Sequence, residues 1–300
     1  QGSAFAMNML GDYRRDHGHY AEAYDWYQKA AEVGDAFDKG RALDALGKMY
    51  LDGYLGEDKE VTAVRYFEKA SELGYASGTL HLAQCYDNGW GVAEDVERAF
   101  TYYLKTVEDA GDINKSAKVE AFNRLGVMYL NGDLGENGDA TAAQYFAQAA
   151  DVGDAWGAAN LAECYGVGLG VAQDAAKAFA YYQMAAEAGN EKGMKGIAGC
   201  YAEGKGVAQD DKKALFWYRK AAEAGDTSAM LLAGDYLRDN GHAAEARDWY
   251  EKAAEEGDED TKGWAFNRLG IMYSDGLLGR DGTEKAIRYF EKSAEFGCAA

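Results

Sequence analysis

Three short glycine-bounded segments are the parts of this sequence that most resemble a phosphate-binding loop. They read GWG at 89–91, GLG at 168–170 and GKG at 204–206. A dinucleotide-binding loop needs a preceding strand and a third glycine at a fixed offset. Here each segment lies between two predicted helices, so we interpret all three as helix-to-helix turns and predict no nucleotide cofactor.

The other residue types that carry chemistry do not form a legible catalytic set. Four histidines lie at unrelated places, except that His19 and His242 each stand where a second helix of a repeat begins. The acidic loops at 52–58 and 133–136 do not match the spacing of a calcium loop. No Ser-His-Asp or Cys-His arrangement is visible. The sequence therefore predicts neither a metal site nor an enzyme, and a hydrolase is only a remote alternative.

The cysteines follow a structural pattern instead. Cys85, Cys164 and Cys200 each precede a recurring tyrosine, in a position that other repeats fill with Met49, Met128 or Met272, or with Asp12 or Asp235. A position shared by Cys and Met is typical of a small, polarizable core residue. Equivalent positions in separate repeats lie beyond disulfide reach. We expect free, buried thiols, which favour a reducing compartment.

Those cysteines sit within an eightfold repeat. A tyrosine recurs at intervals of 35 to 43 residues, and an aromatic pair lies between successive tyrosines. A period of this size is typical of a stacked helical array, in which each unit buries its apolar face against its neighbours. The recurring tyrosines are Tyr13, Tyr50, Tyr86, Tyr129, Tyr165, Tyr201, Tyr236 and Tyr273; the pairs are 26–27, 66–67, 102–103, 145–146, 181–182, 217–218, 249–250 and 289–290.

One repeat, residues 42–74, shows the expected elements. Ala42, Leu46, Gly47 and Tyr50 share one helix face, and a second helix is predicted over 60–73. A glycine closes that second helix, at 74 here and at 34, 111, 153, 189, 225, 257 and 297 in the other repeats. Aspartates at 95, 139, 174 and 210 mark second-helix starts. Small residues at −4 and +1 from the core leucine let the paired helices approach closely.

These patterns resemble the Sel-one-like repeat family, a branch of the tetratricopeptide superfamily. The match is clearest at 168–182 and 204–225, where a G-x-G-V loop leads to an aspartate, then Lys-Ala and an aromatic pair. Ala93, Ala172 and Ala208 stand where the family usually has proline. The resemblance implies an all-α, right-handed α/α superhelix. It also implies a scaffold or adaptor role, as in bacterial members of the family.

We interpret residues 1–3, which lack methionine, as an expression-vector remnant, and 4–300 as a single solenoid. Its eight repeats are expected at about 4–35, 36–75, 76–112, 113–154, 155–190, 191–226, 227–258 and 259–300. The sequence contains no run of 18 apolar residues, so it predicts no membrane span. A signal peptide could have been removed. The net charge of −20 argues against nucleic acid and anionic membranes as partners.

A partner surface is expected on the first helices, opposite their core stripe. Positions −5, −2, +2 and +5 from the core leucine point away from the second helices. Ten large apolar residues fall there, and the charges nearly balance. The apolar residues are Met7, Leu51, Leu80, Val127, Leu130, Trp156, Met230, Leu237, Trp264 and Ile271; the charged ones are Arg14, Arg41, Lys48, Lys192, Lys195, Asp44, Asp87, Glu120 and Glu163.

Asparagine and arginine recur on or beside this face in the two AFNRLG segments, at 121–126 and 265–270. Asparagine suits the backbone of an extended peptide, and arginine suits a carboxylate. Repeat duplication also explains the match, and packing between repeats also explains the tryptophans. The predicted partner-binding residues are His81, Gln84, Asn123, Arg124, Val127, Trp156, Asn160, Glu163, Trp264, Asn267, Arg268 and Ile271.

The sequence therefore predicts a scaffold that binds a protein or peptide in the groove lined by the first helices. A structural spacer or an engineered array without a ligand is the alternative. Because the last helix carries Ile287 and Phe290 without an evident polar cap, we expect a fragment of a longer array or end-to-end self-association. Cys298 is predicted to be the most exposed thiol.

Overall fold

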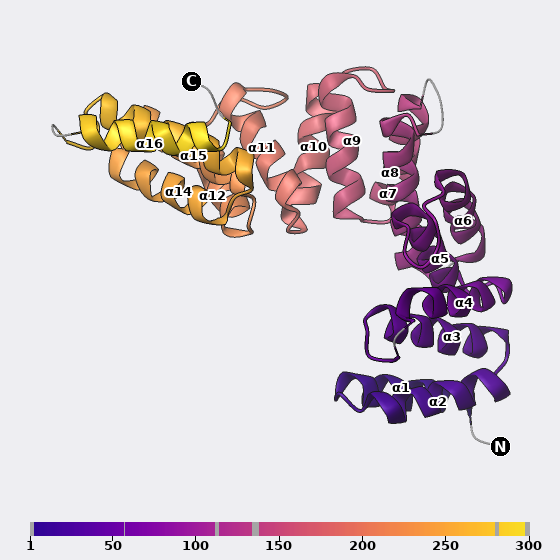
Figure 1. Cartoon of the computed structure of the whole chain (residues 1–300). Helices are drawn as coiled ribbons and strands as arrows, with labels where there is room; N and C mark the ends of the chain where they lie inside the picture. The colour runs from indigo at the N-terminus through magenta and orange to yellow at the C-terminus, as the bar shows by residue number, and fades with distance from the viewer. Residues whose placement is uncertain (1–2, 57, 112–113, 134–137, 280–281, 298–300) are drawn as a thin grey trace. The chain divides into compact units, whose positions relative to one another are not determined.

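The computed structural model describes residues 3–56, 58–111, 114–133, 138–279 and 282–297. These residues form sixteen helices, arranged as eight pairs in which the second helix runs back along the first (Figure 1). The first helices are α1 (Ala4–Asp16), α3 (Ala36–Leu51), α5 (Ala76–Asn88), α7 (Lys115–Asn131), α9 (Ala155–Val167), α11 (Glu191–Glu203), α13 (Thr227–Asp239) and α15 (Glu259–Ser274). The second helices are α2 (Tyr20–Val33), α4 (Lys59–Glu72), α6 (Val96–Asp109), α8 (Asp139–Asp151), α10 (Ala175–Glu187), α12 (Asp211–Glu223), α14 (Ala243–Glu256) and α16 (Thr283–Glu295).

The chain divides into two compact units, residues 1–152 with α1–α8 and residues 153–300 with α9–α16. Within each unit every helix packs on its partner and on the following pair. The predicted all-α solenoid of paired helices is confirmed.

Aspartates begin many of these helices. The side chains of Asp95, Asp174 and Asp210 accept hydrogen bonds from backbone N–H groups of the first turn, as predicted. Asp139 differs, because α8 begins at Asp139 itself after Gly138. It still lies in the first turn, where a negative charge is favourable beside the helix dipole.

The predicted closing glycine stands at the end of the second helix in all eight repeats, but its backbone conformation differs in two. Gly74, Gly111, Gly153, Gly189, Gly225 and Gly297 have positive φ angles. Gly34 and Gly257 have φ of −69° and −71° with extended ψ. There Asp35 and Asp258 follow at once and cap α3 and α15. Glycine is needed at Gly34 because an added Cβ would lie 2.8 Å from the Asp38 Cβ.

Two aromatic layers fill the core. In five repeats the second member of the aromatic pair lies against a glycine of the first helix, as Phe67 does against Gly47, where an added Cβ would lie 2.4 Å from the ring. The first member stacks on the recurring tyrosine, as Tyr66 does on Tyr50, with ring centroids 5.6 Å apart. The same stack occurs at 86/102, 129/145, 165/181 and 273/289.

The tyrosine-based alignment is wrong by one residue in the first and seventh repeats. Gly11 packs on Tyr27 and Gly234 on Tyr250, as Gly47 packs on Phe67. The residue that matches Leu46 is therefore Leu10 in α1, which is 41% exposed, and Ala233 in α13, which is fully buried. This shift explains why Met230 and Leu237, predicted on the partner face, are 0% and 1% exposed. It also makes Ala229, and not Ser228, the small residue at −4.

The cysteine prediction is confirmed for the described thiols, since Cys85, Cys164 and Cys200 are free and buried. Burial raises the pKa of the Cys85 thiol to about 12. Cys298 lies outside the described residues. Among the helices that the structure describes, none is long and apolar enough to cross a membrane.

Candidate partner-binding face on the first helices

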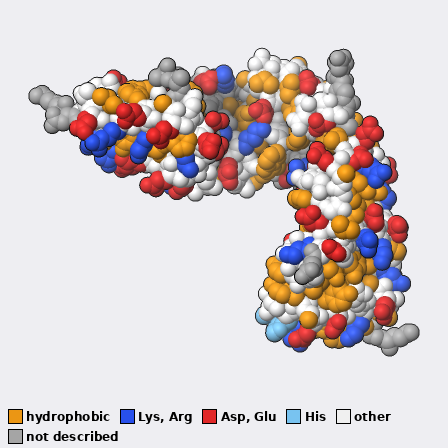
Figure 2. Space-filling model, in the orientation of Figure 1, with side chains coloured by type: hydrophobic (Ala, Val, Ile, Leu, Met, Phe, Trp, Pro, Cys, Tyr) orange, Lys and Arg blue, Asp and Glu red, His pale blue; other side chains and the backbone are white. Residues whose placement is uncertain are grey.

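With the alignment corrected, the first-helix face comprises positions −5, −2, +2 and +5 from the aligned residues Leu10, Leu46, Leu82, Leu125, Leu161, Ile197, Ala233 and Leu269. The charges on this face now balance at six each. The basic residues are Arg15, Arg41, Lys48, Lys192, Lys195 and Arg238, and the acidic residues are Asp12, Asp44, Asp87, Glu120, Glu163 and Asp235. Figure 2 likewise shows basic and acidic side chains interspersed on the visible side.

In the first unit, polar pairs on or beside this face join each first helix to the next. Arg41 of α3 donates to Asp12 of α1 at 2.6 Å. His81 Nδ1 of α5 lies 2.6 Å from the Asp44 carboxylate of α3. Gln84 of α5 donates to Glu120 of α7 at 2.6 Å. These pairs fix the spacing of the four first helices.

The second unit repeats the arrangement with other residues. Lys192 of α11 donates to Asn160 of α9 at 2.8 Å and forms an ion pair with Glu163. Lys195 of α11 reaches Asp226, the N-cap of α13, at 2.8 Å. Its contact helps to hold the pKa of the Asp226 carboxyl below its usual value, against the opposing effect of burial.

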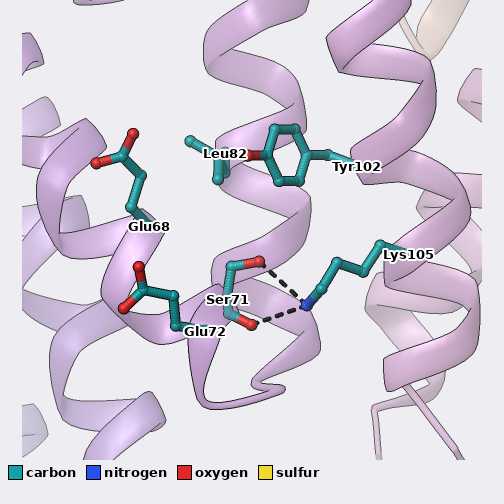
Figure 3. A pocket seen from close by; sticks show the side chains of 6 residues that line it. All are labelled: Glu68, Ser71, Glu72, Leu82, Tyr102 and Lys105. Atoms are coloured by element: carbon teal, nitrogen blue, oxygen red, sulfur yellow. Dashed lines mark hydrogen bonds between the residues drawn. The ribbon is translucent and has the colours of Figure 1, made fainter.

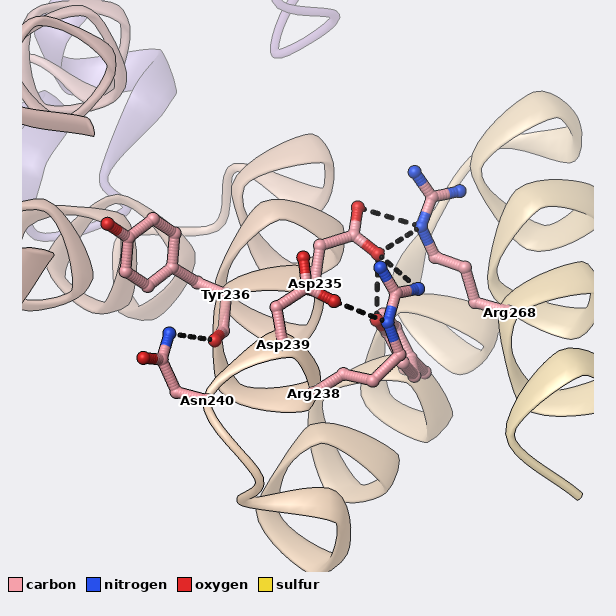
Figure 4. Close-up of polar contacts among 7 residues, drawn as sticks. Asp235, Tyr236, Arg238, Asp239, Asn240 and Arg268 are labelled. Carbon is pink, nitrogen blue, oxygen red and sulfur yellow. Dashed lines mark hydrogen bonds and ion pairs between the residues drawn. The ribbon is translucent and has the colours of Figure 1, made fainter. Parts of the chain in front are cut away.

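Asp235 is the most connected residue of this face (Figure 4). Its carboxylate accepts from Tyr250 Oη at 2.8 Å, from Arg268 Nε at 2.8 and 2.9 Å, and from Arg238 at 3.2 Å. One carboxylate thus joins α13, α14 and α15. Burial, and next the Asp235 charge, raise the pKa of Tyr250 above its ordinary value.

The first repeat contains the same hub. Asp12 accepts from Tyr27 Oη at 2.7 Å and contacts Arg15 and Arg41. Sequence reasoning missed both hubs, because the tyrosine alignment placed Asp12 and Asp235 in a core position. The shared Gly-Asp-Tyr at 11–13 and 234–236 is the signal that identifies them.

The predicted partner-binding residues fall into two groups. The first group contacts other repeats or is buried: His81, Gln84, Asn160, Glu163, Asn267 and Arg268. The second group faces solvent at least in part: Asn123, Arg124, Val127, Trp156, Trp264 and Ile271. Asn123 also makes contacts within the chain.

The structure brings these residues together in three places. In the first unit, His81 and Gln84 lie on α5, and Asn123, Arg124 and Val127 lie on the adjacent α7. In the second unit, Trp156 lies with Asn160 and Glu163 on α9. Trp264, Arg268 and Ile271 form a stripe along α15, with the Arg268 guanidinium 5.7 Å from the Trp264 ring centroid.

The apolar prediction is correct only in part. Trp156, Trp264 and Ile271 are 54%, 49% and 37% exposed. Leu80, Met230 and Leu237 are buried, which corrects their assignment to the face. Leu80 packs in the core cluster of the first unit. The tryptophans and Ile271 therefore remain as apolar side chains that project from the face.

A hollow of about 370 Å³ lies apart from this face, between α4 and α6 (Figure 3). Glu68, Glu72 and Tyr102 line it. Its Lys105 donates to Ser71 Oγ at 3.3 Å and to the Ser71 carbonyl at 2.8 Å, and it pairs with Asp109. Its one lysine is therefore already paired. No group of three or more His, Cys, Asp or Glu residues suited to a metal occurs in the described ranges.

Comparison with known proteins identifies relatives of this architecture. The c5321 protein, a protective antigen of uropathogenic Escherichia coli strains that displays an SLR fold, is 32% identical, with a TM-score of 0.78 over 98% of this chain and 62% of its own. A Sel1 repeat protein from Oxalobacter formigenes, 24% identical with a TM-score of 0.65 over 96% of both chains, shares the fold.

A curated relative is chitin synthase regulatory factor 2 of Schizosaccharomyces pombe. It is 26% identical over 127 residues, which span 42% of this chain and 23% of that protein. This chain thus covers less than two thirds of both c5321 and the regulatory factor.

The family assignment rests on the repeats themselves. The Sel1 repeat pattern matches residues 4–35, 40–75, 76–108, 119–154, 157–190, 193–226, 227–258 and 267–297. These segments cover most of the chain and correspond to the eight helix pairs. The chain therefore belongs to the Sel1 repeat family.

Proposed function

We propose that this chain is a non-enzymatic scaffold that binds an extended segment of a partner protein on its first-helix face. The observation that carries the proposal is the exposure of Trp156, Trp264 and Ile271 on a face where neighbouring charges are largely paired. Large apolar side chains rimmed by satisfied polar groups are typical of interaction sites.

Further observations support a protein partner. The balanced charge of the face suits a polypeptide of ordinary composition, and the charge of −20 disfavours nucleic acid. The similarity to a chitin synthase regulatory factor supports a role exerted through another protein.

The two groups of predicted residues have different roles in this proposal. In the second unit, Trp156, Trp264 and Ile271 contact the partner. In the first unit, Val127 and Arg124 form a separate contact surface. His81, Gln84, Asn160, Glu163, Asn267 and Arg268 position those residues by fixing the spacing of the first helices.

The test is affinity capture with immobilised protein, followed by calorimetry on the partner recovered. Trp156→Ala with Trp264→Ala is expected to weaken the interaction at least about a hundredfold, because each large aromatic anchor contributes about 2 kcal/mol or more. Trp90→Ala is the matched control, since Trp90 is 37% exposed but lies after α5, outside the face.

Equal binding by the double variant and the parent would place the partner elsewhere on the chain. Failure of the parent to retain any partner would favour the spacer or ligand-free array.

A further inference from the structure

A second hollow lies on the first-helix side of the second unit, between α9 and α11 with α10 as its floor. Its volume is about 410 Å³. The residues that matter for its chemistry are Gly166, Val167, Ala178, Tyr182, Gly199 and Cys200. The hollow therefore lies within the face to which we assign partner binding.

Two glycines that have no packing role open this hollow. An added Cβ at Gly166 would approach only the Ala178 Cβ, at 3.8 Å, and one at Gly199 only the Tyr218 hydroxyl, at 3.8 Å. By contrast, Gly47 and the other glycines that face aromatic rings leave no such room. Neither Gly166 nor Gly199 has a positive φ angle. Glycine destabilises a helix interior, so the helical structure does not explain why glycine stands at these two positions.

Two other repeats place a large apolar side chain at each of these positions, whereas most of the rest carry polar or charged ones. Gly199 is at +2 of its helix, where α7 has Val127 and α15 has Ile271. Gly166 is at +5, where α3 has Leu51 and α7 has Leu130. An aliphatic side chain is therefore compatible with each position, and glycine leaves that volume open here.

A hydrogen-bond donor also faces this hollow. Tyr27, Tyr103 and Tyr250 each donate their hydroxyl to an aspartate of the first helix, at 2.7 to 2.8 Å. Tyr182 is the corresponding tyrosine of the fifth repeat and lines the hollow, but Gly166 stands where α5 has Asp87. Glu163 is instead paired with Lys192. No residue of the described chain accepts from the Tyr182 hydroxyl.

The charges around the hollow are already matched. Lys192 pairs with Glu163, Lys195 with Asp226 at 2.8 Å, and Lys205 with Glu203. Burial raises the pKa of Tyr182 and of the Cys200 thiol, so both are neutral at pH 7. An ionised side chain would lose hydration here without meeting an unpaired opposite charge. A neutral occupant is therefore complementary.

We propose that this hollow seats one large apolar side chain (leucine, methionine or phenylalanine) from an extended partner segment, whose adjacent backbone carbonyl accepts from Tyr182 Oη. The proposal rests on the scaffold function proposed above and defines the anchor of the bound segment. The side chain packs on the Tyr182 ring and on Ala178, beside the two glycines.

The test uses a displayed library of random linear 12-residue peptides, selected on the 1–300 chain and then measured by fluorescence polarisation. The recovered peptides are expected to share one large apolar residue, and its replacement by aspartate should weaken binding about tenfold to a hundredfold.

Gly199→Val and Gly166→Leu fill the hollow with side chains that occur at these positions in other repeats. Each is expected to weaken peptide binding at least tenfold. Neither should lower the melting temperature of the protein, because a better helix former replaces glycine. Tyr182→Phe should weaken binding about two- to tenfold, the value of one hydrogen bond. Lys212→Val is the matched control, as it places valine on the exposed side of α12, outside the first-helix face.

The proposal is overturned if the peptides bind the two filled variants as tightly as the parent. If the same peptides then lose affinity for Trp156→Ala with Trp264→Ala, the scaffold function stands and only the anchor is wrong. If the parent selects no peptide, both proposals fail.

Discussion

The Asp235 hub gives the sharpest test of how neighbouring repeats are held together. Asp235→Ala removes the acceptor of the fully buried Tyr250 hydroxyl and the shared partner of Arg238 and Arg268. Three helices lose their common contact in one substitution. The helix itself is little affected, because alanine is the best helix former.

The size of the effect follows from the burial of each partner. A hydrogen bond to a charged group contributes about 1.5–3 kcal/mol, and a buried hydroxyl left without a partner costs a similar amount. The two arginine side chains are each 24% exposed, so their ion pairs add about 1 kcal/mol at most. We therefore expect Asp235→Ala to lower the free energy of unfolding by about 2–4 kcal/mol.

Urea unfolding followed by circular dichroism measures this value, and a double-mutant cycle separates its parts. Tyr250→Phe alone should cost about 1 kcal/mol, and the two substitutions together should show a coupling of about 1–2 kcal/mol. Asp239→Ala is the control, because Asp239 binds Arg238 from a side chain that is 65% exposed, and should cost less than about 0.5 kcal/mol. Strict additivity of Asp235→Ala and Tyr250→Phe would refute the hub.

Three further predictions concern packing, alkali and thiols. Gly47→Ala should lower the free energy of unfolding by about 1–3 kcal/mol, because the added Cβ would lie 2.4 Å from the Phe67 ring. Gly199→Ala should instead stabilise the fold slightly, because its added Cβ has room and alanine favours the helix. Thermal melts of the two variants and the parent measure both effects. Burial raises the pKa of Tyr218 to about 12, whereas a tyrosine in an unfolded chain has a pKa of about 10. The stabilisation that Tyr218 contributes is therefore complete below about pH 10 and is lost as the pH rises through about 12. Measuring the free energy of unfolding against pH in alkaline solution tests this. In a thiol-reagent assay Cys298 should react at once, and three thiols should react only on unfolding, namely Cys85, Cys164 and Cys200.

The repeat and its helices could be predicted from sequence because they depend on local patterns. The small residue beside an aromatic ring, and the aspartate before the second helix in repeats such as those of Asp95, Asp174 and Asp210, are visible within one repeat. The stack of Tyr50 on Tyr66 follows from the same period. Contacts within one repeat can therefore be predicted from the sequence of that repeat.

The alignment of the first and seventh repeats could not be found from tyrosines alone. Tyr13 and Tyr236 stand one position after Asp12 and Asp235, so an alignment on tyrosine places the aspartates in the core. Only the contacts of Gly11 and Gly234 with their aromatic rings show the shift. Glycine is the better marker because its place is set by a close approach, whereas tyrosine fits several neighbouring positions.

The polar contacts between repeats were also beyond the sequence. Asn160 and Arg268 have the chemistry of peptide-binding residues, but each already binds a side chain of a neighbouring repeat. A side chain's own type does not say whether its partner comes from the same chain. Whether a side chain is already paired depends on which residues of two neighbouring helices face each other. The sequence pattern of one repeat does not contain this information.

This division gives the face two separable properties. Polar residues such as Asp12, Asp235 and Lys192 set the spacing between first helices, and a segment that crosses several helices must match that spacing. Apolar residues such as Trp156 and Trp264 do not join neighbouring first helices, and they contact the side chains of the bound segment. Substitutions of the polar group should therefore change stability and binding together, whereas substitutions of the apolar group should change binding alone. Parallel unfolding and binding measurements on Asp235→Ala and Trp264→Ala would reveal the difference, and loss of stability in Trp264→Ala would mean that the tryptophan belongs to the packing.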